Sequence, residues 1–291
     1  MRLDDIVIRD PYVLADAHAG KYYMYASSPL PLCKGFCAYI SEDLQNWQAP
    51  QSVFVADKTF WAQDDFWAPE VHYYCGKYYM FATFGMREVG RTSQILVSDS
   101  PMGPFVVHSG ALAPEDWFAL DATLYIKNGE PYAIFSHEWV QIADGEMCYV
   151  KLKEDLSGTI DTPNTMFKAS NSGWAKVPGW SKDKDVYITD APYVYSIDGV
   201  EFMLWSSWSD SIDAAYSVGV VYPCDGDLFG GKYRHRLLNL PHKDAGHAMM
   251  FKDFDGNNRI AYHKNNSQAG GERAVIAYAK IDKGELYVYE K

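Results

Sequence analysis

The sequence has no long hydrophobic run and little positive charge. No apolar segment approaches the roughly 20 residues that a membrane-spanning helix needs, and residues 1–5 lack the apolar core of a secretory signal. We therefore expect no membrane partner and a cytoplasmic location. Only 26 Lys and Arg stand against 38 Asp and Glu, a formal net charge of −12. This balance disfavours a nucleic-acid partner, whose phosphates need a basic surface.

Cysteine is scarce as well. The five cysteines are an odd number without the two pairs typical of a zinc site, so we expect free thiols rather than a disulfide framework. They are Cys33, Cys37, Cys75, Cys148 and Cys224. Helical periodicity is also missing, since no window keeps a 3.6-residue apolar period between two capping residues. The hydrophobic share of 48% and the aromatic share of 15% nevertheless suffice for a large core, which we expect to be all-β.

Five segments repeat one pattern, in which a polar start leads into an apolar strand, a glycine turn and an aromatic strand. The turn glycines lie 56, 53, 70 and 57 residues apart, at Gly20, Gly76, Gly129, Gly199 and Gly256. A period of this length is typical of a propeller blade. The longest spacing includes an insertion at residues 170–185, expected to be a surface loop that carries Trp174 and Trp180. We predict an all-β, five-bladed β-propeller with four-stranded antiparallel blades around a central channel, as one domain over residues 1–291.

Polar residues near the starts of the first strands are expected to converge. In a propeller these strands lie beside the channel and run in the same direction, and the residues concerned are Asp10, Glu70, Asp121, Asp190 and His247. The second strands return to the same face with Phe84, His137, Glu138 and His263. Carboxylates gathered at one channel mouth repel each other, which raises the pKa of one and leaves another ionised. Glycoside hydrolysis requires such a protonated acid and ionised base.

Five motifs stand in consistent order over nearly the whole chain. They are Arg9-Asp10-Pro11, Trp67-Ala68-Pro69-Glu70-Val71, the strand start at Asp121, Thr189-Asp190-Ala191-Pro192 and Gly246-His247. Together they resemble glycoside hydrolase family 43. The resemblance implies a five-bladed propeller and inverting cleavage of α-L-arabinofuranosyl or, less favoured, β-D-xylosyl linkages in plant-derived oligosaccharides. Arabinose-containing substrates rank first. The family's β-xylosidases generally carry an additional C-terminal β-sandwich, whereas the given sequence ends with its fifth repeat.

The resemblance also implies roles for individual carboxylates. Asp10 would be the general base that deprotonates the attacking water, and Asp121 would tune the pKa of the general acid and hold its orientation. The family's acid is usually a Glu before Gly-Pro or Ala-Pro, whereas this chain has Asp190 there, which is one methylene shorter. Glu138, at the return end of the second strand of blade three, is the alternative acid.

Further site residues follow from the same resemblance. The histidine of blade five lies by a metal ion, often calcium, in the family's arabinan-degrading members, so His247 is the candidate metal residue. No cofactor is required, and calcium in the channel is the candidate ion. Trp67 and Phe84 are expected sugar platforms, because a sugar ring offers C–H faces to an aromatic ring. The other expected substrate-binding residues are Glu70, His137, His247 and His263.

Two other functions would use the same features. A glycoside phosphorylase on a related propeller would use phosphate in place of water and would need a basic cluster, to which Arg87 and Arg91 could contribute. A catalytically silent sugar-binding propeller would explain the shorter side chain of Asp190. Pure binding, however, does not require the repelling carboxylates Asp10 and Asp121.

Overall fold

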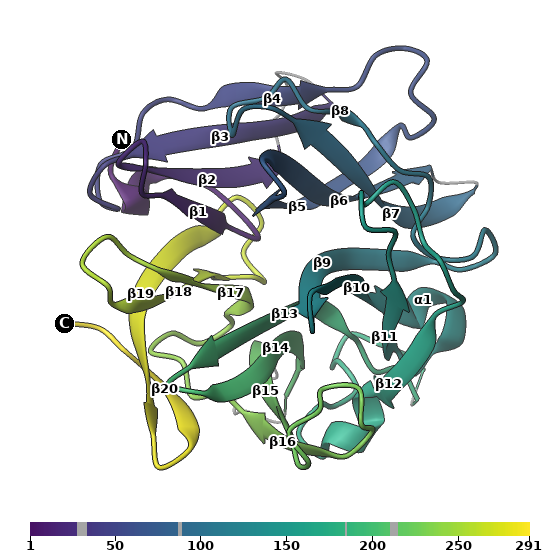
Figure 1. Cartoon of the computed structure of the whole chain (residues 1–291). Helices are drawn as coiled ribbons and strands as arrows, with labels where there is room; N and C mark the ends of the chain where they lie inside the picture. The colour runs from purple at the N-terminus through teal and green to yellow at the C-terminus, as the bar shows by residue number, and fades with distance from the viewer. Residues whose placement is uncertain (28–33, 87–88, 184, 210–214) are drawn as a thin grey trace.

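The computed structural model describes residues 1–27, 34–86, 89–183, 185–209 and 215–291. Within these ranges the chain forms five sheets of four antiparallel strands, and each sheet uses four strands that are consecutive in sequence. Figure 1 shows the five sheets arranged as blades in a ring, with the first and the fifth blade side by side. The predicted five-bladed β-propeller is confirmed. Among the described residues, no helix is long and apolar enough to cross a membrane.

The strands follow the predicted repeat in order. Blades one and two comprise β1 (Tyr12–Asp16), β2 (Lys21–Ser27), β3 (Gly35–Ser41), β4 (Gln51–Val55), β5 (Asp64–Tyr74), β6 (Lys77–Met86), β7 (Gly90–Ser98) and β8 (Val106–Val107). Blade three comprises β9 (Ala119–Lys127), β10 (Glu130–His137), β11 (Glu146–Lys151) and β12 (Asn164–Lys168), with the one-turn helix α1 (Trp139–Ile142) between β10 and β11.

The last two blades complete the ring. They comprise β13 (Asp190–Ile197), β14 (Val200–Trp208), β15 (Tyr216–Pro223), β16 (Tyr233–Leu237), β17 (Gly246–Lys252), β18 (Asn258–Lys264), β19 (Arg273–Asp282) and β20 (Glu285–Tyr289). The second strand of every blade contains a fully buried aromatic side chain, namely Tyr25, Phe81, Phe135, Trp205 and Tyr262. Such large rings supply much of the apolar area that holds neighbouring sheets together.

A left-handed residue lies just before or within the inner strand of every blade. The φ angle is 51° at Asp10, 45° at Ala68, 55° at Asp121, 52° at Ala191 and 54° at His247. In blades two to five the ladder between the first and second strands shifts register at this point, as a β-bulge does. Residues other than glycine rarely adopt this conformation and persist in it where the surroundings hold them, often at active sites. We refer to these five positions as the blade kinks.

Side chains of the neighbouring blade hold four of the blade kinks. The amide of each kink residue donates to an acceptor on the preceding blade: Asp10 to His263 Nδ1 (3.2 Å), Asp121 to Thr83 Oγ1 (2.9 Å), Ala191 to Asp121 Oδ2 (3.0 Å) and His247 to Ser206 Oγ (2.8 Å). These bonds satisfy buried amides that the bulge removes from the ladder. The kinks therefore also lock the blades together.

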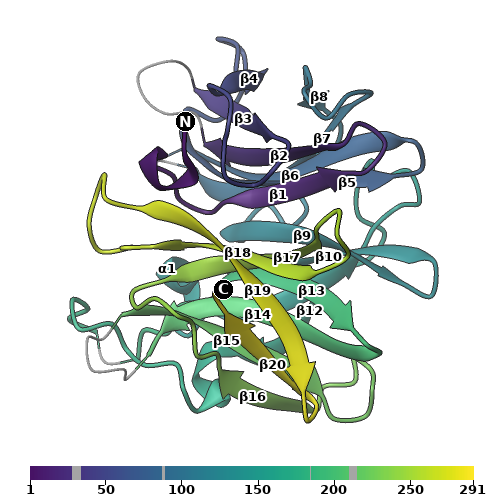
Figure 2. The same ribbon diagram turned by 90° about the vertical axis from the view of Figure 1, so that its left-hand side faces the viewer.

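The ring closes at a seam between blades one and five. Both described sheets keep their own four consecutive strands there, and the N-terminal segment before β1 lies across the join (Figure 2). Val7 forms a β-bridge with Arg273, and the Ile8 amide donates to the Glu272 carbonyl at 3.2 Å. Ile6 and Ile8 are 1% and 5% exposed, whereas Val7 between them is 50% exposed.

This alternation predicts unequal effects of two neighbouring truncations. Replacing buried Ile6 with Ala (Ile6→Ala) should lower the free energy of unfolding by about 2–5 kcal/mol, through lost burial and a cavity at the seam. Val7→Ala should change it by less than about 0.5 kcal/mol, because the side chain is exposed. Urea unfolding of both variants measures the difference. Equal midpoints for the two would contradict a closing role for Ile6.

Candidate active site

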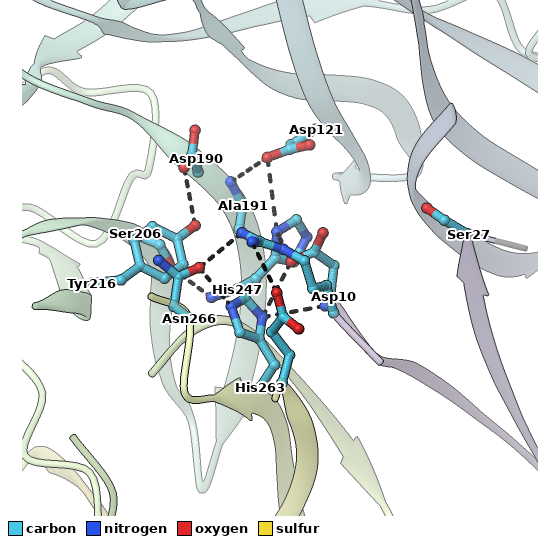
Figure 3. A network of polar contacts seen from close by, with 12 residues as sticks. Asp10, Ser27, Asp121, Asp190, Ala191, Ser206, Tyr216, His247, His263 and Asn266 are labelled. Carbon is cyan, nitrogen blue, oxygen red and sulfur yellow. Dashed lines mark hydrogen bonds and ion pairs between the residues drawn. The ribbon is translucent and has the colours of Figure 1, made fainter. Parts of the chain in front are cut away.

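A cavity of about 760 Å³ opens at the face where the blade kinks gather. Its size is typical of a small-molecule or oligosaccharide site. Residues from all five blades line it, including six of the predicted ones: Asp10, Trp67, Asp121, Glu138, Asp190 and His247. Figure 3 shows Asp10, Asp121 and Asp190 around His247. The predicted convergence of blade-start residues is therefore present for these side chains.

Asp10 is held by two imidazole rings. Its Oδ1 lies 3.2 Å from Nδ1 of His247 and 3.2 Å from Nδ1 of His263. Burial alone would raise the pKa of Asp10, but the charge of protonated His247 and the Arg9 guanidinium outweigh burial and hold this pKa well below its ordinary value. The carboxyl group is therefore ionised at neutral pH, as a general base must be.

His263 belongs to a chain of contacts behind Asp10. Its Nε2 lies 3.0 Å from Oδ1 of Asn266, which also accepts a hydrogen bond from Arg9 Nη2 at 2.7 Å. Because Asn266 Oδ1 is an acceptor, Nε2 carries the ring proton, and Nδ1 is free to accept the Asp10 amide. The ring is fully buried. His263 therefore positions Asp10, and the prediction that it contacts substrate directly is corrected.

His247 links two of the carboxylates. Its Nδ1 lies 3.2 Å from Asp10 Oδ1 and 3.9 Å from Asp121 Oδ2. Burial lowers the pKa of His247 to about 4, so the ring beside Asp10 is neutral at pH 7.

The residues around His247 do not by themselves fit a calcium ion. Calcium takes six to eight oxygen ligands, whereas two carboxylates approach this imidazole. Across the described part of the chain, no group of three or more His, Cys, Asp or Glu side chains has a metal-binding arrangement.

Asp121 is a buried carboxyl that holds the backbone of the next blade. Its Oδ2 accepts the amide of Ala191 at 3.0 Å. Burial, together with the charges of Asp190 and Asp10, raises the pKa of Asp121 well above its ordinary value. Since Ala191 follows Asp190 directly, this bond fixes the main chain that carries the predicted acid.

Asp190 sits one residue before its blade kink. Asp10 and Asp121 are kink residues themselves, so Asp190 is equivalent in the fold to Arg9, Trp67 and Leu120 rather than to the other two acids. Burial, together with the charges of Glu138 and Asp10, raises the pKa of Asp190 to about 7, against a hydrogen bond of 3.0 Å from the Tyr216 hydroxyl to Oδ2. A carboxyl with this pKa is substantially protonated near neutrality, as a general acid must be.

Glu138 lines the same cavity but has a different partner. Its Oε1 forms an ion pair with Arg91 Nη1, while Arg91 Nη2 lies 3.0 Å from Asp65 Oδ2 and the guanidinium stacks 4.6 Å from the Trp67 ring centre. Oε2 of Glu138 is buried without a hydrogen-bond partner. Burial raises the pKa of Glu138, and Arg91 opposes this rise. Two carboxylates thus already neutralise Arg91.

Of the two arginines considered for the basic cluster of a phosphorylase, the structure describes Arg91, which lines the cavity. Arg87, the other residue considered for that role, lies outside the described residues, as does Cys33 of the cysteine set. Of the remaining cysteines, Cys75, Cys148 and Cys224 are free thiols, as expected from the sequence.

Besides His263, three predicted substrate-binding residues lie outside the lining of the main cavity. Phe84 is wrong as a sugar platform: it is fully buried, and its ring packs edge-on against Phe60 and Phe66 at 5.0 and 5.5 Å. His137 is corrected too, because it stacks on Trp117 at 3.9 Å and is not part of the cavity lining. Glu70 is buried, 3.1 Å from His72 Nε2, and lines a second, much smaller cavity together with Asp10 and His247.

Four aromatic residues line the main cavity without having been predicted to do so: Trp139, Trp180, Trp208 and Tyr216. For Trp174 and Trp180 of the inserted loop, the sequence leaves substrate contact and packed surface cover as alternatives. A signal existed for the others, because second strands end and third strands begin at the same face. Trp208 ends β14, Tyr216 begins β15, and Trp139 directly follows Glu138.

Comparison with known proteins identifies relatives. The sequence model described as glycosyl hydrolases family 43 matches residues 6–281. The chain is 26% identical over 135 residues to alpha-L-arabinofuranosidase 43 from Humicola insolens, and 21% identical over 208 residues to extracellular endo-alpha-(1->5)-L-arabinanase 1 from Bacillus subtilis (strain 168). These matches cover 44% and 67% of this chain but only 27% and 62% of the two relatives, less than two thirds of either.

Solved structures resemble the chain over nearly its whole length. The crystal structure of an endo-arabinase from Bacteroides thetaiotaomicron VPI-5482 has a TM-score of 0.89 and 37% identity, with 98% of each chain covered. An endo-1,4-beta-xylanase from the same organism has a TM-score of 0.77 and 21% identity, with 98% of this chain and 95% of that chain covered. The second likeness shows the fold alone.

Proposed function

Because this chain belongs to glycosyl hydrolases family 43, we propose that it hydrolyses α-L-arabinofuranosyl linkages of oligosaccharides with inversion of the anomeric centre. One observation carries the proposal: a single cavity holds Asp10, whose pKa is lowered, and Asp190, whose pKa is raised to about 7. An ionised base and a protonated acid in one site are what this reaction needs. The 37% identical endo-arabinase favours arabinose over xylose as the sugar.

The proposed reaction assigns one step to each group. Asp190 donates its proton to the glycosidic oxygen as the bond from that oxygen to the anomeric carbon breaks. Asp10 takes a proton from a water molecule, whose oxygen bonds to the same carbon from the opposite face. Asp121 holds Asp190 in place through the Ala191 amide. In this assignment Glu138 raises the pKa of Asp190 and stays paired with Arg91.

The test is product release from arabino-oligosaccharides, with xylo-oligosaccharides in parallel. The anomeric configuration of the first product, read by proton NMR before mutarotation, should be opposite to that of the substrate. Retention, turnover of xylosides alone, or turnover that requires phosphate would each contradict the proposal.

The two pKa shifts predict the pH dependence of kcat/KM. Asp190 must be protonated, so kcat/KM should fall about tenfold per pH unit above a pH of about 7. Asp10 must be ionised, and since its pKa lies below the ordinary 3.8, activity should persist at pH 4 to 5. Initial rates from pH 4 to 9, with circular dichroism to confirm folding, measure the profile. Full activity at pH 9 would contradict Asp190 as the acid.

A further inference from the structure

Three tryptophans form a corner on one wall of the cavity. The rings of Trp139 and Trp180 are 5.7 Å apart, and Trp180 meets Trp208 nearly edge-on, at 5.9 Å and 88°. All three line the cavity, and Trp180 is 57% exposed. We call Trp139, Trp180 and Trp208 the tryptophan corner. Because Trp180 meets Trp208 nearly edge-on, a flat face of its indole ring stays available. Such an apolar face suits the C–H face of a sugar.

The inserted loop is built to carry Trp180. Its other tryptophan, Trp174, is 8% exposed and packs 4.7 Å from the buried Trp205. A side chain at Gly219 would collide with the Trp174 ring. Ala175 then bridges to Ser209, beside Trp208, so the loop is pinned five residues before Trp180. Trp174 therefore acts as an anchor and Trp180 as an exposed surface, which separates two residues that the sequence could not tell apart.

The tryptophan corner lies on the side of the acid. Trp208 contacts the Tyr216 ring at 4.9 Å, and the Tyr216 hydroxyl donates to Asp190. In an inverting hydrolase the acid faces the leaving-group oxygen, while the base faces the water on the other side of the reacting sugar. The sugar that leaves must therefore lie on the Asp190 side of the bond.

From this geometry we infer that the tryptophan corner is the binding subsite for the leaving sugar, with Trp180 as its stacking surface. The inference rests on the proposed function and adds a specificity: the enzyme should prefer substrates whose leaving group is a sugar ring. Trp67, which stacks on Arg91, is not part of the proposed subsite.

Two substrates with different leaving groups test the inference. Arabinotriose has a sugar leaving group, whereas α-L-arabinofuranosyl fluoride loses a single atom that cannot reach Trp180. Trp180→Ala should lower kcat/KM for arabinotriose about tenfold and change it for the fluoride less than about twofold. Trp180→Phe, which keeps a ring, should restore most of the loss. Because Trp180 is exposed, neither variant should impair folding.

Tyr73→Ala is the matched control, since Tyr73 is an equally exposed aromatic, at 62%, that does not line the cavity. This variant should have the wild-type kcat/KM for both substrates. An equal loss on both substrates for Trp180→Ala would place Trp180 under the reacting sugar, and no loss on either would make it ordinary surface; both results overturn the inference. If the wild type cleaves neither substrate, the proposed function itself fails, and the subsite with it.

Discussion

Replacing Asp10 with Asn should reduce kcat/KM for every substrate by about 10²–10⁴-fold, the range typical of a lost general base. The change removes the charge that takes the proton from water but keeps nearly the same volume. Asn also tolerates the left-handed backbone of this position, where φ is 51°. The loss should be as large on activated aryl arabinofuranosides as on oligosaccharides, because both need the same water.

The chain offers a matched control for this variant. Asp198 has the same φ of 51° but is exposed in the turn between β13 and β14, away from the cavity. Asp198→Asn should therefore leave kcat/KM unchanged. Thermal unfolding and oligosaccharide binding of Asp10→Asn should match the wild type. Residual activity above one tenth of the wild-type value would exclude Asp10 as the base.

The second large effect separates Asp190 from Glu138. Asp190→Asn should lower kcat/KM for arabino-oligosaccharides by about 10²–10⁴-fold, but far less for 4-nitrophenyl α-L-arabinofuranoside, whose leaving group needs little protonation. Glu138→Gln breaks the ion pair with Arg91 and should lower kcat/KM for both substrates by a similar factor. Only the true proton donor distinguishes between the two leaving groups.

A third variant examines the length of the acid. Asp190→Glu introduces the residue usual in the family and should retain measurable activity on oligosaccharides, because the carboxyl still faces the cavity. A reversed pattern, in which Glu138→Gln spares the aryl substrate and Asp190→Asn does not, would assign proton donation to Glu138. The decline of kcat/KM above a pH of about 7 should disappear in the variant that lacks the proton donor.

The blades could be predicted from sequence because their signals are local and repeat. Each glycine turn joins an apolar strand to an aromatic one, and five copies fix the number of sheets. The same repeat placed Asp10, Asp121 and His247, which the structure shows as equivalent blade kinks. It could not reveal that Asp190 stands one residue earlier, since that offset arises from the bulges between first and second strands.

The sequence does not show toward which face the side chains of the second strands point. Every residue from Tyr79 to Gly85 of β6 is buried, because this strand packs on both faces, against neighbouring blades. A polar-apolar alternation that would show which side faces the cavity is therefore missing. Phe84 was misplaced for this reason. Trp180 was undetermined for another: its position depends on the anchoring of Trp174 against Trp205, a contact between distant segments.

The seam between blades one and five has a kinetic meaning. Contacts within a blade join residues close in sequence, whereas Asp10 reaches His263 and Arg9 reaches Asn266 over separations of 253 and 257 residues. Contacts so distant carry the greatest loop-closure cost and form late in folding. The proposed base is therefore oriented only when the ring has closed. Catalytic activity should appear as the final event of refolding, and heating should inactivate the enzyme before the blades lose their sheet structure.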